Sequence, residues 1–412
     1  MPLIVEKYGG TSVANSNRIR EVAAHVAHRQ RSGDQLALVV SAMGSETDDL
    51  LHLATNVANN PPERELDMLI TGGERKACAL VAMAISDLGV PAASFTGSQA
   101  GFVTDTKHTN AKILRITPNR IKDAVAEGTV PVVGGSQGMS VDKDITFLGR
   151  GGSDTTAVAL AHALNADVCE LYTDVTGVFS TDPRIVPEAR CMKSTSFREL
   201  LEMTANGCPK PAMRAVEIAR TYNVKLHVRS AFTWTPGTIV TGEENMENVI
   251  ISSVTHKIGE AKLTVSGVVD RPGIAAQLFR ALADKDVNVD MIVQNVSSKG
   301  VTDISFTSPI DQLSAAREVV NMMKSKLGAS GVRTYDNLAR VSLVGAGMKN
   351  TPGVAARMFE TLAENGINIE LISTSAIRVS CVVKAEHAER AVAVLHSAFE
   401  LEKPPHERAS LR

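Results

Sequence analysis

The sequence predicts an α/β protein in which a three-layer domain is followed by two small domains with a ferredoxin-like βαββαβ order. Three observations support this prediction: strand and helix patterns alternate over residues 1–240, a polar stretch follows at 242–248, and the rest of the chain contains an internal repeat. Alternating strands and helices favour a mostly parallel sheet with helices on both faces. A chain of 412 residues is also too long for a single core.

The N-terminal domain, residues 1–240, is predicted from the spacing of its apolar residues. The run Leu36–Val40 is apolar throughout, which is typical of a strand buried in a parallel sheet. Residues Ser16–Arg29 instead carry apolar side chains at helical spacing. The same criteria predict further strands and helices at Leu3–Val5, Ala77–Leu88, Val130–Val133, Ile145–Leu148, Asp154–Leu164 and Val168–Tyr172. Ligand-binding loops are then expected at the carboxyl ends of the strands.

The C-terminal part repeats at a fixed spacing. Pro272 and Pro352 are 352 − 272 = 80 positions apart. The same spacing separates the pairs Gly273/Gly353, Phe279/Phe359, Leu282/Leu362 and Asn288/Asn368. This gapless register indicates a duplicated domain, 262–334 and 340–405, whose second strands are predicted at Val287–Val293 and Ile367–Ile372. Each Pro-Gly either only turns the chain or begins a helix whose free N–H groups bind a carboxylate.

The glycine-rich stretch Leu148–Thr156 lies between a predicted strand and a predicted helix. Backbone N–H groups at a helix N-terminus bind anions, and glycines let a ligand approach them closely. Arg150 adds a planar guanidinium that suits a carboxylate or a phosphate. This stretch therefore indicates a site for a small anionic substrate.

A lysine beside a glycine loop marks the end of the first strand. Lys7 precedes Gly9 and Gly10, an arrangement that suits phosphoryl transfer because negative charge spreads over the transferred oxygens. The alternative is a surface lysine before a turn. The loop Tyr172–Arg184 also follows a strand and is rich in hydroxyl groups, which favours nucleotide or substrate binding over a simple solvated loop.

Two shorter segments carry weaker signals. Ser41–Asp48 follows the second strand, and Thr71–Glu74 is predicted to precede an apolar helix. Glu74 is then either a substrate contact or a first-turn carboxylate favoured by the helix dipole.

Composition excludes several classes of protein. The net charge is −2, which argues against a nucleic-acid or membrane-surface protein, and no apolar run reaches the 18 residues of a membrane span. The 5 cysteines and 10 histidines form no metal-binding pattern, so no metal ligand is predicted. A cytoplasmic protein with reduced thiols is expected.

Several motifs together resemble the aspartokinase family, in its monofunctional, lysine- and threonine-regulated class. They are Lys7–Val13, Val40–Gly44, Leu148–Thr156, Tyr172–Val178 and Thr181–Arg184. The resemblance covers essentially the whole chain. It implies an amino-acid-kinase-like catalytic domain at 1–240 and two ACT domains. The first ACT domain would be 262–334, and the second would combine 340–405 with a strand at 250–257.

The resemblance implies that ATP phosphorylates L-aspartate to 4-phospho-L-aspartate, with Mg²⁺. The catalytic residues would be Lys7, Arg150 and Asp154. Substrate would contact Ser41, Thr47, Glu74, Arg150, Gly151, Gly152 and Ser153. ATP would contact Lys7, Tyr8, Gly9, Gly10, Thr173, Asp174, Phe179, Ser180, Thr181, Asp182, Pro183, Arg184 and Lys210. Lys7 would stabilise the transferring phosphoryl group, and Arg150 would bind the α-carboxylate.

The resemblance also implies that lysine or threonine binds at the ACT domains as an effector. One half of the effector site would be Asp270, Pro272, Gly273, Ile274, Ala275, Asn288, Val289, Asp290, Gln294 and Asn295. The other half would be Met348, Asn350, Pro352, Gly353, Val354, Asn368 and Ile369. Pairing of ACT domains implies a homodimer or a higher assembly, and Met246 is a candidate start for a shorter subunit.

Three segments depart from the family pattern. Thr71–Glu74 replaces Ser-Thr-Gly-Glu, Gly135–Gly138 lacks an aromatic residue, and Gly207–Pro211 displaces the ATP-side lysine to Lys210. These changes leave two alternatives to an aspartate kinase. One is a specialised paralogue that phosphorylates a related carboxylate, and the other is an amino-acid sensor with weak catalysis.

Overall fold

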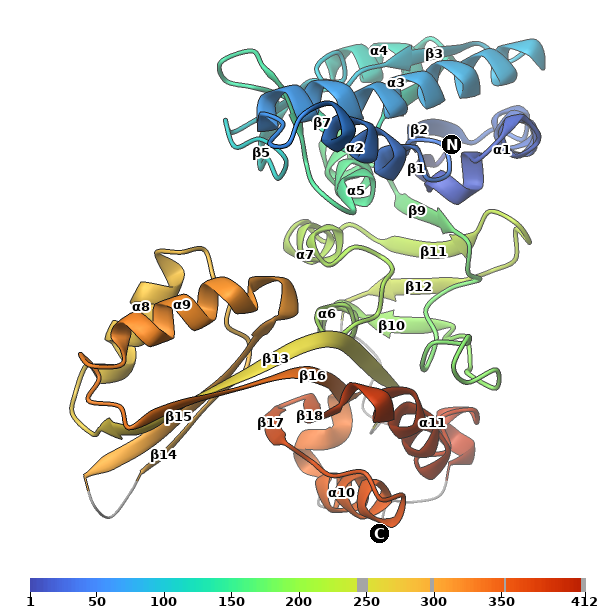
Figure 1. The fold of residues 1–412 in the computed structure, drawn as a ribbon. Helices are drawn as coiled ribbons and strands as arrows, with labels where there is room; N and C mark the ends of the chain where they lie inside the picture. Colours follow the sequence, from blue (N-terminus) through green and yellow to red (C-terminus); the bar gives the residue numbers. More distant parts are fainter. Residues whose placement is uncertain (243–250, 297–299, 352, 409–412) are drawn as a thin grey trace. The chain divides into compact units, whose positions relative to one another are not determined.

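A computed structural model describes residues 1–242, 251–296, 300–351 and 353–408 (Figure 1). The chain divides into two compact units. The first comprises Met1–Phe179, Cys191–Ala205 and Pro209–Met246, and the second comprises Ser180–Arg190, Asn206–Cys208 and Glu247–Arg412. The predicted start Met246, the strand residue Ile250 and the effector residue Pro352 lie outside the described residues, as does the side chain of Asn350.

An eight-stranded sheet forms the centre of the first unit, in the order β10-β12-β11-β9-β1-β2-β6-β3. All its strands run parallel except β10 and β12. The strands are β1 (Leu3–Tyr8), β2 (Gln35–Val40), β3 (Ala92–Phe95), β6 (Val130–Gly134), β9 (Val168–Thr173), β10 (Ser194–Ser196), β11 (Leu226–Ser230) and β12 (Thr238–Thr241). A smaller sheet has the order β5-β4-β7-β8, formed by β4 (Phe102–Thr104), β5 (Ile113–Ile116), β7 (Gln137–Ser140) and β8 (Ile145–Phe147).

Helices cover both faces of the larger sheet. Helices α1 (Ser16–Arg31) and α3 (Glu63–Asp87) pack through apolar side chains against Ile4 and Tyr8 of β1. Lys7 points to the other face, because side chains alternate along a strand, and there it meets α5 (Gly152–Leu164). The remaining helices of this unit are α2 (Glu46–Val57), α4 (Asn119–Ala126), α6 (Phe197–Ala205) and α7 (Met213–Tyr222). The predicted three-layer α/β architecture is confirmed.

The second unit is built on one six-stranded antiparallel sheet with the order β14-β15-β13-β16-β18-β17 (Figure 1). The first copy uses the later part of β13 (Ser253–Val269), then α8 (Ile274–Ala283), β14 (Ile292–Val296), β15 (Val301–Pro309), α9 (Leu313–Met323) and the start of β16 (Gly331–Val344). The second uses the end of β16, then α10 (Val354–Glu364), β17 (Leu371–Ser375), β18 (Arg378–Lys384) and α11 (Ala388–Ala398). Its fourth strand is the beginning of β13, which precedes the other elements in the chain. The first copy thus has the βαββαβ order, and the second completes the same ferredoxin-like set with a strand from its N-terminal side.

Two details of the sequence prediction are wrong. The second strand of each copy begins later than predicted, at Ile292 and Leu371, because residues such as Asn288 and Asn368 lie in irregular segments that precede the strands. Thr71–Glu74 does not precede a helix but lies inside α3. A glycine is needed there because a Cβ at Gly73 would lie 2.9 Å from the Cβ of Ala42.

Parts of the N-terminal sequence are built into the second unit. The backbone amide of Val254 in β13 donates to the Ser180 carbonyl oxygen at 2.8 Å, and the Ser180 hydroxyl lies 2.9 Å from Nε2 of His396 in α11. The Ser342 hydroxyl donates to Asn206 Oδ1 at 3.3 Å. These bonds tie Ser180–Arg190 and Asn206–Cys208 to the repeated domains.

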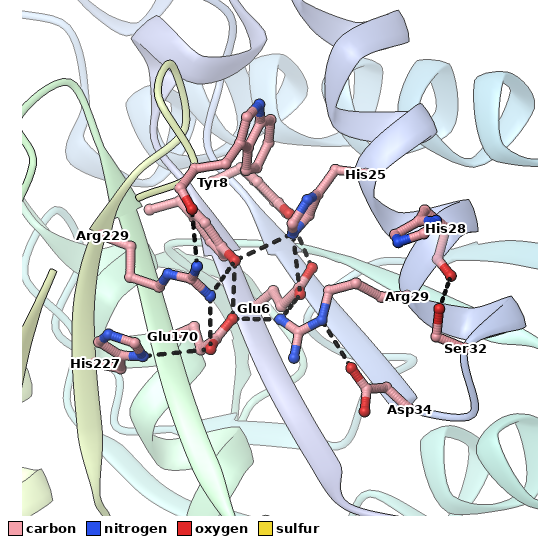
Figure 2. Close-up of polar contacts among 12 residues, drawn as sticks. Glu6, Tyr8, His25, His28, Arg29, Ser32, Asp34, Glu170, His227 and Arg229 are labelled. Carbon is pink, nitrogen blue, oxygen red and sulfur yellow. Dashed lines mark hydrogen bonds and ion pairs between the residues drawn. The ribbon is translucent and has the colours of Figure 1, made fainter. Parts of the chain in front are cut away.

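A buried polar network fills the face of the first sheet under α1 (Figure 2). One terminal nitrogen of Arg29 donates to Glu6 Oε1 at 2.6 Å and to Glu170 Oε2 at 2.5 Å, which joins β1 to β9. Tyr8 donates to the other oxygen of Glu6, and Arg229 to the other oxygen of Glu170. All four carboxylate oxygens therefore have a partner.

None of the helices in the described ranges is long and apolar enough to cross a membrane.

Candidate active site

A buried ion pair marks the carboxyl end of β1. Lys7 Nζ lies 2.7 Å from Asp154 Oδ1 at the start of α5, and the two side chains are 9% and 10% exposed. The amide of Ala212, just before α7, donates to Asp154 Oδ2 at 2.9 Å. Burial opposes ionisation of Asp154, but the Lys7 ammonium and this amide outweigh it and hold the pKa of Asp154 below its usual value. Asp154 is thus ionised at neutral pH.

The glycine loop after Lys7 leaves room beside this ammonium. A Cβ at Gly9 would lie 3.3 Å from Lys7 Nζ, and a Cβ at Gly10 would lie 2.8 Å from the Gly44 carbonyl oxygen. The amide of Gly44 donates to the Gly10 carbonyl, which fixes the loop against the segment after β2. A side chain at Gly10 would clash with backbone and one at Gly9 would crowd the ammonium, so the two glycines leave backbone and ammonium open to a phosphate.

A second lysine lies beside the carboxyl end of β9. Lys210 Nζ donates to Asp174 Oδ1 at 3.0 Å, and the Thr173 hydroxyl donates to the same oxygen at 2.8 Å. Burial alone would raise the pKa of Asp174. The hydrogen bonds from Thr173 and Lys210 outweigh burial, so the pKa lies below its usual value. Lys210 also lowers the pKa of Asp154 through its charge, so the two lysines act on one region despite the altered Gly207–Pro211 segment.

The Arg150 side chain projects into solvent at the glycine-rich loop. It is 90% exposed, and its terminal nitrogen lies 3.6 Å from Asp48 Oδ1 in the first turn of α2. Gly149 and Gly151 on either side have φ of +86° and +71°, which glycine adopts without strain. The predicted substrate residue Thr47 lies in the same turn of α2, so the structure brings Arg150 and this turn together.

Glu74 is a buried carboxylate with one oxygen unused. The side chain lies in the middle of α3, is 2% exposed, and its Oε2 has no hydrogen-bond partner. Burial raises the pKa of Glu74 to about 7, and the nearby charge of Glu46 adds to this, although the backbone amides of Glu74 and Ala42 act against it. A buried carboxylate oxygen without a partner is costly, so a cationic ligand group is expected at this position.

The start of α5 is packed closely against the end of β6. The hydroxyl of Ser153 lies 2.9 Å from that of Ser136, and the Ser136 amide donates to Thr156 Oγ1 at 3.0 Å. A Cβ at Gly135 would lie 2.5 Å from Ser153 Oγ, and one at Gly152 would lie 2.9 Å from Ser136 Oγ. Ser153 and Gly152 are therefore enclosed at the sheet edge, while Gly151 is exposed.

The predicted ATP residues fall into two groups. Those in the first unit include Tyr8, whose side chain is fully buried and donates to Glu6, so only its backbone is free to meet a ligand. Ser180–Arg184 belong to the second unit, where Asp182 binds the Arg184 guanidinium. Their predicted contact with ATP stays a prediction.

The predicted effector residues that the structure describes lie at the starts of α8 and α10 and in or just before β14 and β17. Gly273 and Gly353 precede these helices with φ of +87° and +97°, and a Cβ at either would meet no atom within 4 Å. Asp290 pairs with the buried Arg340 of β16, which also binds Glu260 at 2.7 Å. Burial alone would raise the pKa of Asp290, but Arg340 outweighs burial and holds the pKa below its usual value. Asn288, Gln294, Asn295 and Asn368 are exposed, whereas Ile274, Met348 and Val354 are buried.

Two residues that shape this site carry no recognised motif in the sequence. Asp67 in α3 and Arg214 in α7 both bind backbone near Leu148. Asp67 lies on the buried side of α3 with Ile70 and Glu74, and a carboxylate at helical spacing from apolar side chains would have been the signal.

Comparison with known proteins agrees with this geometry. The amino acid kinase family profile matches residues 2–230, and the ACT domain profile matches 263–322 and 341–399. Aspartokinase of Mycolicibacterium smegmatis is 54% identical and that of Corynebacterium glutamicum 48% identical, each over 97% of both chains.

Solved structures show the same relationship. The aspartate kinase of Synechocystis is 41% identical with a TM-score of 0.55, over 98% of this chain and 70% of that one. Aspartokinase III of Escherichia coli, in complex with aspartate and ADP, is 23% identical with a TM-score of 0.82, over 97% of this chain and 100% of that one, and so shares the fold. These relatives do not favour the sensor or the specialised paralogue. The chain belongs to the aspartokinase branch of the amino acid kinase family.

Proposed function

We propose that this enzyme transfers the γ-phosphoryl group of ATP to the side-chain carboxylate of L-aspartate, giving 4-phospho-L-aspartate and ADP. The observation that carries the proposal is the buried Lys7–Asp154 pair beside a glycine loop at the carboxyl end of β1. A carboxylate nucleophile with a pKa near 4 is already ionised at neutral pH, so the reaction needs no general base. It needs positioned reactants and fixed positive charge.

Lys7 supplies that charge at the phosphoryl group. Because Asp154 holds the ammonium in place, Lys7 does not have to reorganise as negative charge develops on the transferred oxygens. Lys210 adds a second cation on the nucleotide side.

The amino-acid end of the substrate would be held by two opposite charges. The Arg150 guanidinium would bind the α-carboxylate through two N–H groups. The unpartnered oxygen of Glu74 would accept from the α-ammonium group. Thr47 and Ser41 would complete the substrate side, and Gly151, Gly152 and Ser153 would supply backbone at the helix start.

ATP would lie over the glycine loop, with its phosphates near Lys7 and Lys210. Mg²⁺, when it accompanies ATP, neutralises charge on the phosphate oxygens. Asp154 and Asp174 each already bind a lysine. We therefore assign the ion to the phosphates. The cytoplasmic location and the assembly through ACT domains stay predictions from the sequence.

The proposal is tested by measuring ADP release from the full chain with L-aspartate, L-asparagine and succinate. Aspartate should give the highest kcat/KM, because asparagine lacks the acceptor carboxylate and succinate lacks the ammonium group. Absence of aspartate-dependent ADP release, or a higher kcat/KM with another acid, would refute it.

Regulation is proposed to act through the two Pro-Gly helix starts, with lysine or threonine as effector. Gly353→Asp would place a carboxylate where the effector carboxylate binds, and inhibition should weaken by about tenfold while basal kcat stays unchanged. Gly366→Asp is the matched control, since Gly366 follows the other end of α10, also has a positive φ of +65°, and also has no atom within 4 Å of its Cβ position. The assay adds lysine and threonine separately and together. Equal inhibition of both variants would exclude this effector position.

A further inference from the structure

Three polar side chains outside the predicted site hold the base of the loop that carries Arg150. They are Asp67 of α3, His108 of the segment after β4, and Arg214 of α7, called here the loop clamp. None of the three takes part in the proposed phosphoryl transfer. Asp67 and Arg214 bind the backbone of Phe147 and Leu148, just before Gly149 and Arg150, and His108 contacts Asp67.

Asp67 holds the loop from the α3 side. Its carboxylate accepts from the Phe147 amide at 3.0 Å, from the Thr109 amide at 2.9 Å, and lies 2.8 Å from His108 Nδ1. The side chain is fully buried. A single carboxylate therefore joins the end of β8 to the segment 108–109.

Arg214 holds the loop from the α7 side. Its two terminal nitrogens donate to the carbonyl oxygens of Leu148 and Ala111, each at 2.9 Å. The Ala111 amide in turn donates to the Phe147 carbonyl at 2.9 Å. Arg214 thus joins the same two segments as Asp67, from another helix.

This arrangement is more costly than a structural contact requires. Burial lowers the pKa of Arg214, although Asp105 and Glu217 act against this. The charged guanidinium donates its two terminal N–H groups to two neutral carbonyl oxygens. An apolar side chain would fill the same space without the cost of desolvating a charge. What the guanidinium adds is direction, because its two N–H groups fix both carbonyls in one plane.

The Arg150 side chain has little else to direct it. It is 90% exposed and lies between glycines, so its placement depends on the backbone at Leu148. Resting on the proposed function, we propose that Arg214, supported by Asp67 and His108, is a positioning residue that holds the Arg150 loop where the guanidinium of Arg150 meets the α-carboxylate of the substrate.

The first test compares Arg214→Met with Arg214→Lys in steady-state kinetics of the full chain. Arg214→Met should raise the KM for aspartate at least tenfold and leave the KM for ATP within about twofold, because the nucleotide side is held by Lys7 and Lys210. Arg214→Lys keeps one donor and should recover part of the loss. Arg220→Met, an exposed arginine on the same helix, is the control and should change neither constant.

A double-mutant cycle shows whether Arg214 acts through Arg150. In an Arg150→Ala background, Arg214→Met should raise the KM for aspartate less than twofold further, since the group it positions is gone. An additive tenfold increase would overturn the proposal, and so would an unchanged KM in the single variant. If Arg214→Met does not fold, Asp67→Asn and Arg214→Lys carry the same cycle. Turnover of aspartate by the wild-type chain keeps these outcomes distinct from failure of the proposed function.

Discussion

The two faces of β1 both carry buried charge, yet they use it differently. On the α1 face, Glu6 and Glu170 share Arg29, and every carboxylate oxygen has a partner (Figure 2). On the α5 face, Lys7 meets Asp154 beside an open glycine loop. Glu6 and Lys7 are consecutive in β1, yet Glu6 belongs to a hydrogen-bonded network under α1 and Lys7 to a site that is open to a ligand.

The two faces differ in whether their buried carboxylates still have an oxygen free to bind a ligand. Burial raises the pKa of Glu6 to about 7, whereas His227, Arg29 and Arg229 outweigh burial and hold the pKa of Glu170 at about 2. The carboxylate oxygens of this set are all used and offer no acceptor to a ligand. Glu74 also has a pKa near 7, but one of its oxygens is unsatisfied. Glu74 therefore keeps an acceptor that Glu6 and Glu170 have already used, although its pKa is no more shifted than that of Glu6.

The largest expected effect comes from opening the closed network. Arg29→Met would leave two buried carboxylates without their shared cation and should lower the free energy of unfolding by about 3–5 kcal/mol, measured by urea denaturation. Arg20→Met, exposed on the same helix, should change it by less than about 0.5 kcal/mol. Adding Glu6→Gln to Arg29→Met should restore part of the loss. An Arg29→Met chain as stable as wild type would show that this face is not held by charge.

The next effect comes from the open face. Lys7→Met should lower kcat by about 10²–10³-fold, because the transferring phosphoryl group loses its fixed cation. The same change leaves Asp154 buried without a partner, so stability is measured in parallel. Lys7→Met combined with Asp154→Asn should regain stability but not activity. If kcat recovers together with stability in the double variant, Lys7 stabilises only the fold, and the α5 face of β1 is then structural like the α1 face.

The smallest effect sharpens the contrast by pH. With the Glu74 pKa near 7, lowering the pH from 8 to 6 protonates this carboxyl group, and the KM for aspartate should rise by up to about tenfold. Glu74→Gln should have a raised KM that is flat over this range. A wild-type KM that does not change with pH would exclude Glu74 as the ammonium partner.

The raised pKa of Glu74 also predicts how the free energy of unfolding changes with pH. A carboxyl group whose folded pKa lies above its ordinary 4.5 stabilises the fold below that value and loses this contribution as the pH rises through about 7. The difference in unfolding free energy between Glu74→Gln and wild type should therefore favour the variant more at pH 8 than at pH 5.

The sequence predicts those features whose signal is local. The 80-residue repeat predicts two ferredoxin-like copies, and the glycines beside Lys7 and Arg150 predict where ligands approach. Each signal lies within a few neighbouring positions, so a single sequence is enough to find it.

Features made by distant residues could not be predicted in this way. Arg29 is 141 positions from Glu170, and Arg214 is 66 from Leu148, so no local pattern links them. The sequence predicts that Thr71–Glu74 precedes a helix, and glycine has a low propensity for a helix interior. The close approach of Ala42 to Gly73 overrides that propensity, and only tertiary structure shows it.

The bonds that tie Ser180–Arg190 and Asn206–Cys208 to the repeated domains have a consequence for recombination of this chain. A cut near residue 242 looks clean in sequence, but it would remove Val254 and His396 from Ser180 and leave its polar groups without partners. A chimera that exchanges the regulatory half must therefore take both segments from the same parent as the ACT copies. The part that must be exchanged as one is a set of separate segments, 180–190, 206–208 and the C-terminal domains, rather than one continuous half of the chain.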